Sequence, residues 1–165
     1  MFKSEALNLA AISGIIIGLS LIAGVYLNPQ GKSSSKSKGK STGQEDPEDI
    51  KKNKYTKRDI SKFTGENPDE PILIAVKGIV YDVNVNNGGG YYGPSGPYSL
   101  FSGRDASRLF SLFEFDNGMT EAEINAPIDP LDNLTAEEEE SLEAYIQLFE
   151  SKYKPVGILV EPHEK

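Results

Sequence analysis

A long apolar run without any charged residue stands near the start of this chain, at residues 7–27. Only Asn8, Ser13 and Ser20 are strongly polar within it. A helix of this length would span about 31 Å at about 1.5 Å per residue, which matches the hydrocarbon thickness of a bilayer. The pattern therefore predicts one transmembrane helix over residues 7–27, preceded by a short N-terminus of residues 1–6.

A cleaved signal peptide is the alternative for this segment. Its basic start would consist only of Lys3 beside Glu5, and the apolar run is longer than a usual signal-peptide core, so an uncleaved anchor is favoured. Lysines gather after the run, between Lys32 and Lys40. The positive-inside rule then places the C-terminal part of the chain in the cytosol and the N-terminus in the lumen.

Residues 28–54 are rich in Ser, Lys, Gly and acidic side chains and contain almost no large apolar residue. Such a composition buries too little apolar surface to offset the entropy of ordering. We therefore expect a flexible linker at 28–54, a single folded domain at 55–162 and a short tail at 163–165.

Two β-branched runs, Ile72–Val76 and Ile79–Val83, flank the dipeptide Lys77-Gly78. Two such runs across a two-residue turn that contains glycine are typical of a β-hairpin. The glycine-rich segment Asn86–Gly90 predicts a turn after the hairpin. Residues Val156–Val160 are a candidate for one more strand.

Four segments carry a hydroxyl residue followed three positions later by an acidic one, which is the spacing of a helix N-terminal cap. We expect the first of these helices to end at Gly65 and the last at Pro155, because glycine and proline commonly end helices. The four pairs are Thr56 with Asp59, Ser102 with Asp105, Thr120 with Glu123, and Thr135 with Glu138.

The last of these segments has the clearest helical period. Its apolar residues recur three and four positions apart, so they form one stripe that faces a core. The helix after Ser102 is apolar around most of its circumference and is expected to be largely buried. Together with the hairpin, these short helices predict an α+β fold. The stripe consists of Leu142, Tyr145, Ile146, Phe149 and Tyr153.

Charge is distributed unevenly along the chain, whose net charge is −8. Residues 1–42 carry five lysines against Glu5, whereas the remainder carries 12 basic and 24 acidic side chains. An acidic domain repels phosphate groups, which argues against nucleic acid as a partner and in favour of basic protein surfaces. The chain has no cysteine, so disulfides, zinc–thiolate sites and thiol catalysis are excluded.

The most distinctive local sequence is a loop that begins at Tyr92 and ends at Tyr98, with two Gly-Pro steps between them. Proline fixes φ and glycine reaches dihedrals that other residues avoid, so this loop can hold a defined shape and present its phenols. A phenol oxygen can ligate haem iron. The chain has one histidine, His163, so an iron held by two histidines of this chain is excluded.

The sequence from Tyr92 to Arg108 resembles the signature of the membrane-associated progesterone receptor family, Tyr-Gly-Pro-x-Gly-Pro-Tyr-x-x-Phe-x-Gly-x-Asp-Ala-Ser-Arg. The similarity extends over roughly residues 55–162, and the Pro-Ile-Asp-Pro-Leu-Asp block at Pro127–Asp132 is similar to the fungal branch. This resemblance implies a cytochrome b5-like haem/steroid-binding fold with a small sheet and several short helices.

The resemblance also implies the site. It makes Tyr98 the axial ligand of a ferric haem b, with Tyr92, Lys152 and Tyr153 lining the same pocket. Lys152 would act as a cationic or hydrogen-bonding partner, and Tyr92 and Tyr153 as hydrogen-bond donors near the ligand. Without the resemblance, these tyrosines would be interpreted as loop and core packing, and Asp105 as a structural cap.

The function implied is that of a membrane-anchored, haem-binding regulator of cytochrome P450 enzymes of sterol synthesis, in the endoplasmic reticulum membrane. A steroid- or sterol-binding module and a haem-independent adaptor are the alternatives. A homodimer through an open haem face is also compatible with the resemblance. No arrangement of catalytic residues is recognised, so an enzyme is not expected. Leu109 and Gly90 depart from the family pattern, in which a glycine and a basic residue are common at these positions.

Overall fold

Four short strands pair into one sheet in the part of the chain described by this computed structural model, residues 47–115 and 118–165. The strands are β1 (Lys54–Tyr55), β2 (Leu73–Val76), β3 (Ile79–Asp82) and β4 (Lys154–Leu159). Their order in the sheet is β1-β4-β3-β2. The β1–β4 pair is parallel and the other two pairs are antiparallel.

The hairpin forms as the sequence predicts. Strands β2 and β3 pair in register from Leu73 with Asp82 to Val76 with Ile79, across the turn at Lys77 and Gly78. Both turn residues have positive φ, 46° and 80°. This is the left-handed pair of conformations that a tight two-residue hairpin turn requires.

Strand β4 pairs with β3 through an irregular register. Val80 lies opposite Gly157 but Tyr81 lies opposite Pro155, so Val156 is an extra residue in the strand. Proline has no N–H to donate to a sheet and is therefore found at such bulges. The prediction that Pro155 ends the preceding helix is wrong, because that helix ends at Lys152 and Pro155 belongs to the strand.

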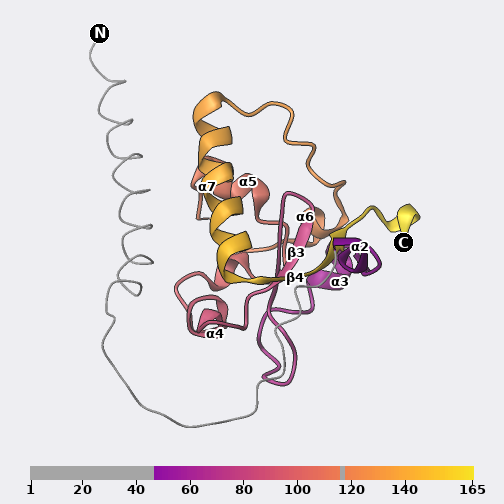
Figure 1. Ribbon diagram of the computed structural model, residues 1–165, viewed down its shortest axis with the longest axis vertical. Coiled ribbons are helices and arrows are strands. Elements are labelled where there is room, and N and C mark those ends of the chain that lie inside the picture. The colour runs from indigo at the N-terminus through magenta and orange to yellow at the C-terminus, as the bar shows by residue number, and fades with distance from the viewer. Residues whose placement is uncertain (1–46, 116–117) are drawn as a thin grey trace. The chain divides into compact units, whose positions relative to one another are not determined.

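Helices lie on both sides of the sheet (Figure 1). Helices α5 and α7 pack against each other, and α3 packs against α6 near the C-terminus. The helical segments of the described residues are α2 (Pro47–Ile50), α3 (Lys57–Ile60), α4 (Gly88–Tyr92), α5 (Ser107–Leu112), α6 (Glu121–Asn125), α7 (Ala136–Lys152) and the 3₁₀ turns η1 (Ser99–Phe101) and η2 (Pro162–Glu164).

Three of the four predicted caps are present. The side chains of Thr56, Thr120 and Thr135 accept hydrogen bonds from the backbone N–H three residues on. The cap predicted at Ser102 is wrong: α5 begins at Ser107, and the Ser102 hydroxyl donates instead to the Tyr92 carbonyl, 2.6 Å away. Helix α3 is also shorter than predicted, since it ends at Ile60 rather than near Gly65.

The segment Asn86–Gly90, predicted as a turn, enters a short helix. Asn86 and Asn87 have positive φ and form the entry to α4, which contains Gly88, Gly89 and Gly90. Glycine is a poor helix former, so propensity gave no signal for a helix here. Close packing with the preceding strand explains it, because a Cβ at Gly88 would collide with the Val83 carbonyl oxygen.

The two faces of the sheet pack against different cores. Along β2, Ile74 and Val76 face a large aromatic cluster, whereas Leu73 and Ala75 face a smaller one. This alternation is the two-residue period of a strand buried on both faces. The large cluster contains Phe101 and Phe110, together with Tyr81, Tyr92, Leu142, Phe149 and Tyr153.

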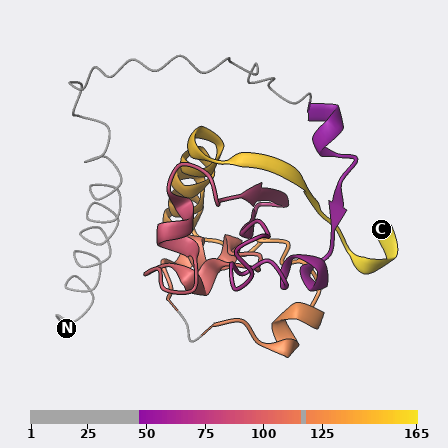
Figure 2. The same ribbon diagram turned by 90° about the horizontal axis from the view of Figure 1, so that it is seen from below.

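The fold extends beyond the predicted limits of 55–162 at both ends. Asn53 bonds to the Val156 carbonyl, and the Lys54 amino group bonds to the Glu164 carbonyl at 2.7 Å. Viewed from below, β4 runs from the end of α7 toward the side where β1 and the C-terminus lie (Figure 2). Residues 53–54 and 163–165 therefore belong to the folded domain.

The predicted transmembrane helix, residues 7–27, lies outside the described residues, as does the linker as far as residue 46. None of the helices in residues 47–115 and 118–165 combines the length and apolar character that crossing a bilayer requires.

Acid is expected to weaken the cap of α3. Partial burial acts to raise the pKa of Asp59, but hydrogen bonds from Lys165 and Thr56 outweigh it and lower the pKa to about 2. A lowered carboxyl pKa stabilises the fold above its ordinary value near 4, and this stabilisation is lost as the pH falls toward 2. Asp59→Asn should therefore cost about 1 kcal/mol at pH 7 and clearly less near pH 2, where about half of the Asp59 carboxyl groups are protonated in the folded chain.

Urea unfolding of the full chain at pH 7 and pH 2 measures this difference. Asp69→Asn is the matched control, because Asp69 is exposed and lies outside the helices. A cost that is equal at both pH values would contradict the assignment of the cap to the ionised carboxylate.

Candidate functional site

The loop between Tyr91 and Tyr98 closes on itself through backbone hydrogen bonds. The Tyr98 N–H donates to the Tyr91 carbonyl at 2.9 Å, and the Gly96 N–H donates to the Gly93 carbonyl at 2.8 Å. The Ser102 hydroxyl donates a hydrogen bond to the Tyr92 carbonyl. The closed loop brings Tyr92 and Tyr98 together, with ring centroids 6.1 Å apart.

Gly96 is the residue that allows this closure. A Cβ at this position would collide with the carbonyl group of Tyr91, the acceptor of the Tyr98 N–H. Gly90, by contrast, has room for a Cβ at ordinary contact distance from the Asn87 side chain. The sequence suggested that the glycines serve backbone dihedrals, but at Gly96 the requirement is close approach of the backbone.

Gly96→Ala is expected to open the loop and lower the free energy of unfolding by about 1–3 kcal/mol, because the backbone around Tyr91 must move. Gly90→Ala is the matched control and should be neutral or slightly stabilising, since alanine favours a helix. Chemical denaturation of the two variants compares them. Equal stability of both would contradict the closed loop.

The three predicted site tyrosines lie together at the end of the large core. Tyr92 packs against Tyr153, with ring centroids 5.9 Å apart, and against Phe149 at 6.2 Å. Tyr98 is half-buried and stacks with Tyr91 at 6.3 Å. The structure therefore joins Tyr92, Tyr98 and Tyr153, which lie on three different elements, into one aromatic group.

Burial raises the pKa of Tyr92 well above its usual value, and the nearby phenols of Tyr153, Tyr145 and Tyr98 raise it further. A hydrogen bond between the two phenols raises the pKa of Tyr92 and acts to lower that of Tyr153. Burial, the largest effect on Tyr153, still raises the pKa of that phenol. Both phenols therefore remain neutral near pH 7 and keep protons to donate.

Lys152 is the last residue of α7 and directly precedes Tyr153, which caps the helix. Its carbonyl accepts a hydrogen bond from the Asn86 side chain at 2.5 Å, which ties the end of α7 to the entry of α4. Partial burial lowers the pKa of the Lys152 amine. A cation at this position is also stabilised by the negative end of the helix dipole. This is a structural role that is independent of any ligand.

Other aromatic residues of the site were not predicted. Tyr145 stacks on Phe110 with ring centroids 4.2 Å apart, and the nearby phenol of Tyr98 raises the pKa of Tyr145. Burial raises the pKa of Tyr145 to about 12. The signal was present in the sequence, since Tyr145, Phe149 and Tyr153 are spaced four apart on one face of a helix.

Leu109 departs from the family pattern, and the structure shows where its larger side chain lies. Its side chain is 8% exposed and belongs to the large core, so its bulk is accommodated between α5 and the sheet. Gly90, the other departure, lies within α4 one residue before the Tyr91–Tyr92 pair.

These residues suit a ferric haem better than other metal groups. The described residues contain no set of three or more His, Cys, Asp or Glu side chains that could hold a metal ion. His163 lies exposed in η2, at the C-terminus. Tyr98 instead offers a half-buried phenol oxygen, and rings that can contact the apolar face of a porphyrin surround it: Tyr91, Tyr92, Phe101 and Phe115.

The chain is similar to a known domain family and to several known proteins. Residues 56–146 match the cytochrome b5-like heme/steroid binding domain family. The cytochrome P450 regulator dap1 of Schizosaccharomyces pombe is 34% identical over 120 residues, which cover 73% of this chain and 70% of that protein. The human membrane-associated progesterone receptor component 2 is 36% identical over 132 residues, which cover 77% of this chain but only 56% of the human protein.

Two solved structures from Arabidopsis are similar as well. One, a hypothetical protein described as having a cytochrome b5 like fold, is 30% identical with a TM-score of 0.52, over 73% of this chain and all of the other. The second, a putative steroid-binding protein, is 34% identical with a TM-score of 0.51, over 66% of this chain and 97% of the other.

Proposed function

The chain belongs to the cytochrome b5-like haem/steroid-binding domains and, among them, to the membrane-associated progesterone receptor family, and from this premise we propose that it binds ferric haem b through Tyr98. The observation that carries the proposal is the closed loop that holds Tyr98 beside Tyr92 and Tyr153. Ferric iron stabilises a phenolate by direct coordination, which makes a neutral tyrosine a competent ligand near pH 7.

Each residue around Tyr98 has a distinct role in this proposal. Tyr92 and Tyr153 keep their protons and can donate hydrogen bonds to an anionic neighbour. Lys152 can supply positive charge toward an anionic group, and partial burial lowers the pKa of its amine. Bound haem would supply an iron that an anionic ligand keeps in the ferric state, which suits a carrier, sensor or regulator better than an electron shuttle.

We further propose that the client is a cytochrome P450 of sterol synthesis. One relative is named a cytochrome P450 regulator, and its match to this chain covers 70% of the length of that relative. The relatives carry names of regulators and binding proteins, which supports a binding role rather than catalysis. An acidic domain can approach a basic protein surface, and charge complementarity of this kind favours rapid association.

Hemin titration of the full chain in non-ionic detergent tests cofactor binding. A high-spin ferric phenolate spectrum that saturates at one haem per chain is the expected result. Association with a sterol-synthesis P450 is then measured with hemin-loaded and haem-free protein. Binding of the P450 that is the same in both states and unaffected by Tyr98→Phe would favour the haem-independent adaptor instead.

A sterol is the second candidate ligand, because relatives are named membrane steroid-binding proteins and a large apolar cluster lies beside the loop. Leu109 and Phe110 are buried in that cluster, and Phe113 lies at the end of α5. Calorimetry of the haem-free protein with a sterol separates the two candidates. Heat released with sterol but none with hemin would favour the steroid-binding module.

We propose that the protein is anchored in the endoplasmic reticulum membrane by residues 7–27, with the domain in the cytosol. Names of relatives as membrane-associated proteins support the membrane, while the single span and the organelle rest on the sequence. Asn133 starts a glycosylation sequon and is exposed. Asn133 should stay unmodified in cells. A glycan that disappears in Asn133→Gln would show that the domain faces the lumen, which contradicts the proposed topology. A homodimer also remains a proposal.

A further inference from the structure

A hollow lies between the turn of the hairpin, the start of α5, the segment 128–134 and the first half of α7. Its volume is about 700 Å³, which is larger than a single side chain or a metal ion needs. None of the predicted site residues lines it. We call it the acidic cleft.

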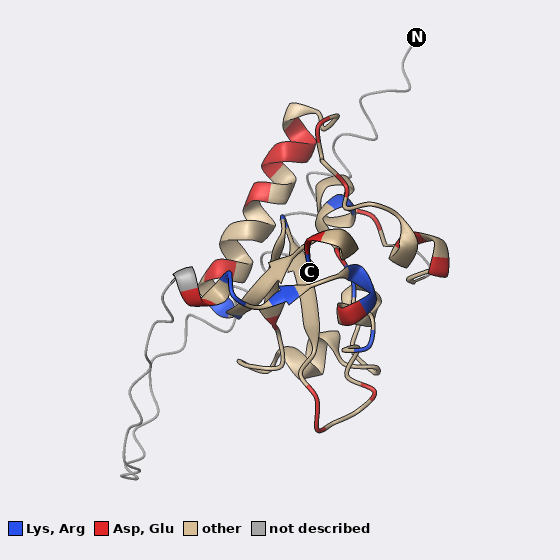
Figure 3. Ribbon diagram, turned by 90° about the vertical axis from the view of Figure 1, so that its right-hand side faces the viewer, with Lys and Arg blue, Asp and Glu red and all other residues tan. Residues whose placement is uncertain are grey.

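Carboxylates stand on both walls of the acidic cleft. Glu139, Glu140 and Glu143 come from α7, and Asp105 and Asp129 come from the opposite side. Figure 3 shows the acidic residues gathered on the first turns of α7. Lys77, at the hairpin turn, is the basic residue among those that line the cleft. The cleft therefore attracts cations and repels phosphate groups.

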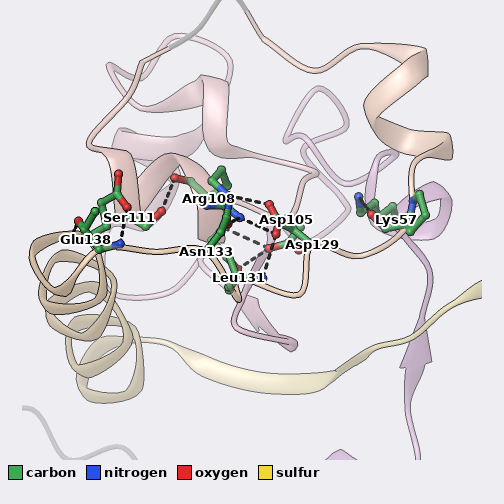
Figure 4. Close-up of polar contacts among 11 residues, drawn as sticks. Lys57, Asp105, Arg108, Ser111, Asp129, Leu131, Asn133 and Glu138 are labelled. Atoms are coloured by element: carbon green, nitrogen blue, oxygen red, sulfur yellow. Dashed lines mark hydrogen bonds and ion pairs between the residues drawn. The ribbon is translucent and has the colours of Figure 1, made fainter.

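Asp129 is already neutralised in part. Arg108 donates to its two carboxylate oxygens at 2.7 Å each and also to Asn133 at 2.8 Å (Figure 4). These hydrogen bonds lower the pKa of Asp129, although partial burial opposes them. Arg108 also fixes the segment 129–133 against α5, so this wall of the cleft has a defined position.

Asp105 differs from Asp129, because one of its carboxylate oxygens has no donor in the described residues. Its Oδ1 accepts the Ser107 N–H at 3.1 Å and the Ser107 hydroxyl at 2.5 Å. The Ser107 hydroxyl in turn accepts the Lys77 N–H at 2.8 Å, which orients the carboxylate. No buried side-chain oxygen lacks a partner in the described residues, so Oδ2 keeps access to the cleft.

The surroundings of Asp105 favour a ligand that carries a positive charge. Asp105 is only partly exposed, and this burial raises the pKa of its carboxyl group despite the hydrogen bonds from Ser107. The nearby negative charge of Asp129 also raises it, and only Lys57 opposes that effect by charge. Lys57 directs its amine to the Pro127 carbonyl, 2.8 Å away. A partly buried carboxylate beside another negative charge is stabilised when a ligand brings a positive charge to it.

The rest of the lining is apolar, so a bare cation would leave much of the cleft unmatched. An aliphatic stem could lie along this surface while its charged end reaches Asp105, as lysine and arginine side chains do. The apolar residues are Ile128, Pro130, Leu131, Leu134 and Leu142.

We propose that the acidic cleft binds a basic segment of a partner protein, with a lysine or arginine side chain paired to Asp105 and a neighbouring apolar side chain against Leu131 and Leu134. Charge complementarity selects this occupant over nucleic acid and anionic membrane surfaces, which the carboxylates repel. The proposal does not depend on haem, since the cleft and the tyrosine site share no residue.

The test uses the full chain in non-ionic detergent and a fluorescein-labelled peptide that repeats lysine, leucine and glycine. Fluorescence anisotropy should show saturable binding, with the same affinity before and after hemin loading. Asp105→Asn should weaken it about tenfold, because the charge is lost while the amide oxygen can still accept from Ser107. Replacing both Glu139 and Glu143 by Gln should weaken it about threefold.

Glu137→Gln is the matched control, because Glu137 is an exposed acid in the first turn of α7 that does not line the cleft. It should change the affinity by less than about twofold. A peptide with serine in place of leucine should bind more weakly, and one with glutamate in place of lysine should not bind.

The proposal fails if the peptide does not bind, or if Asp105→Asn and Glu137→Gln have equal effects. Equal binding of spermidine and the peptide would show a site for small amines rather than for a protein segment. Circular dichroism of Asp105→Asn confirms that the variant is folded. If the unaltered chain binds the peptide but no hemin, the haem proposal is refuted and the peptide proposal stands.

Discussion

Tyr98→Phe is expected to abolish the ferric phenolate spectrum of the hemin-loaded protein and to weaken hemin binding at least tenfold, since loss of a group that supports a metal site already costs about 10–100-fold. The substitution removes only the phenol oxygen. The ring can keep its contacts with Tyr91, Phe101 and Phe115, because these involve the aromatic face and edge. Optical titration with hemin measures both the spectrum and the affinity.

Tyr91→Phe is the matched control for this experiment. Tyr91 precedes the loop, is half-buried like Tyr98 and stacks on it at 6.3 Å, so it experiences nearly the same surroundings. Its loss of a hydroxyl should leave the ferric phenolate spectrum unchanged. An unaltered spectrum in Tyr98→Phe, or the same loss in both variants, would show that Tyr98 is not the ligand.

Phe149→Ala is expected to lower the free energy of unfolding by about 3–5 kcal/mol. Phe149 is fully buried and lies at the centre of the large core. Its ring centroid lies 5.4 Å from that of Tyr81, 5.1 Å from that of Tyr153 and 5.5 Å from that of Phe110. Since a domain of this size has a total stability of about 5–15 kcal/mol, the variant should be close to unfolding.

Phe115→Ala provides the comparison, because the same side chain at position 115 is 50% exposed. It should cost less than about 1 kcal/mol in the haem-free protein, since little apolar surface is removed from a core. Urea denaturation followed by circular dichroism measures both variants. A cost for Phe149→Ala as small as that for Phe115→Ala would contradict the placement of Phe149 in the core.

Local signals in the sequence predicted the elements that local interactions determine. The hairpin follows from two β-branched runs around Lys77-Gly78, and the helix caps at Thr56 and Thr135 each depend on residues three apart. The cap predicted at Ser102 failed because a distant acceptor, the Tyr92 carbonyl, engages its hydroxyl. Tertiary contacts decided that position, and spacing alone carries no information about them.

The candidate site was predictable for a different reason. Tyr92 and Tyr98 were found through a long family signature and Tyr153 through the wider resemblance. The structure adds why they meet, through the Tyr98–Tyr91 backbone bond and the Tyr92–Tyr153 contact. The acidic cleft was not predicted. Asp105 and Asp129 lie far apart in the sequence, and Asp105 was interpreted only as a cap.

The central claim is that a phenol oxygen from the Tyr98 loop holds ferric haem. Resonance Raman spectroscopy of the full chain purified from its native membrane tests it most directly, with a second sample grown on ring-deuterated tyrosine. The account predicts a Soret-absorbing pigment and an iron–phenolate vibration that shifts with deuteration and disappears in Tyr98→Phe. A protein that carries no such pigment and takes up no added hemin would contradict it.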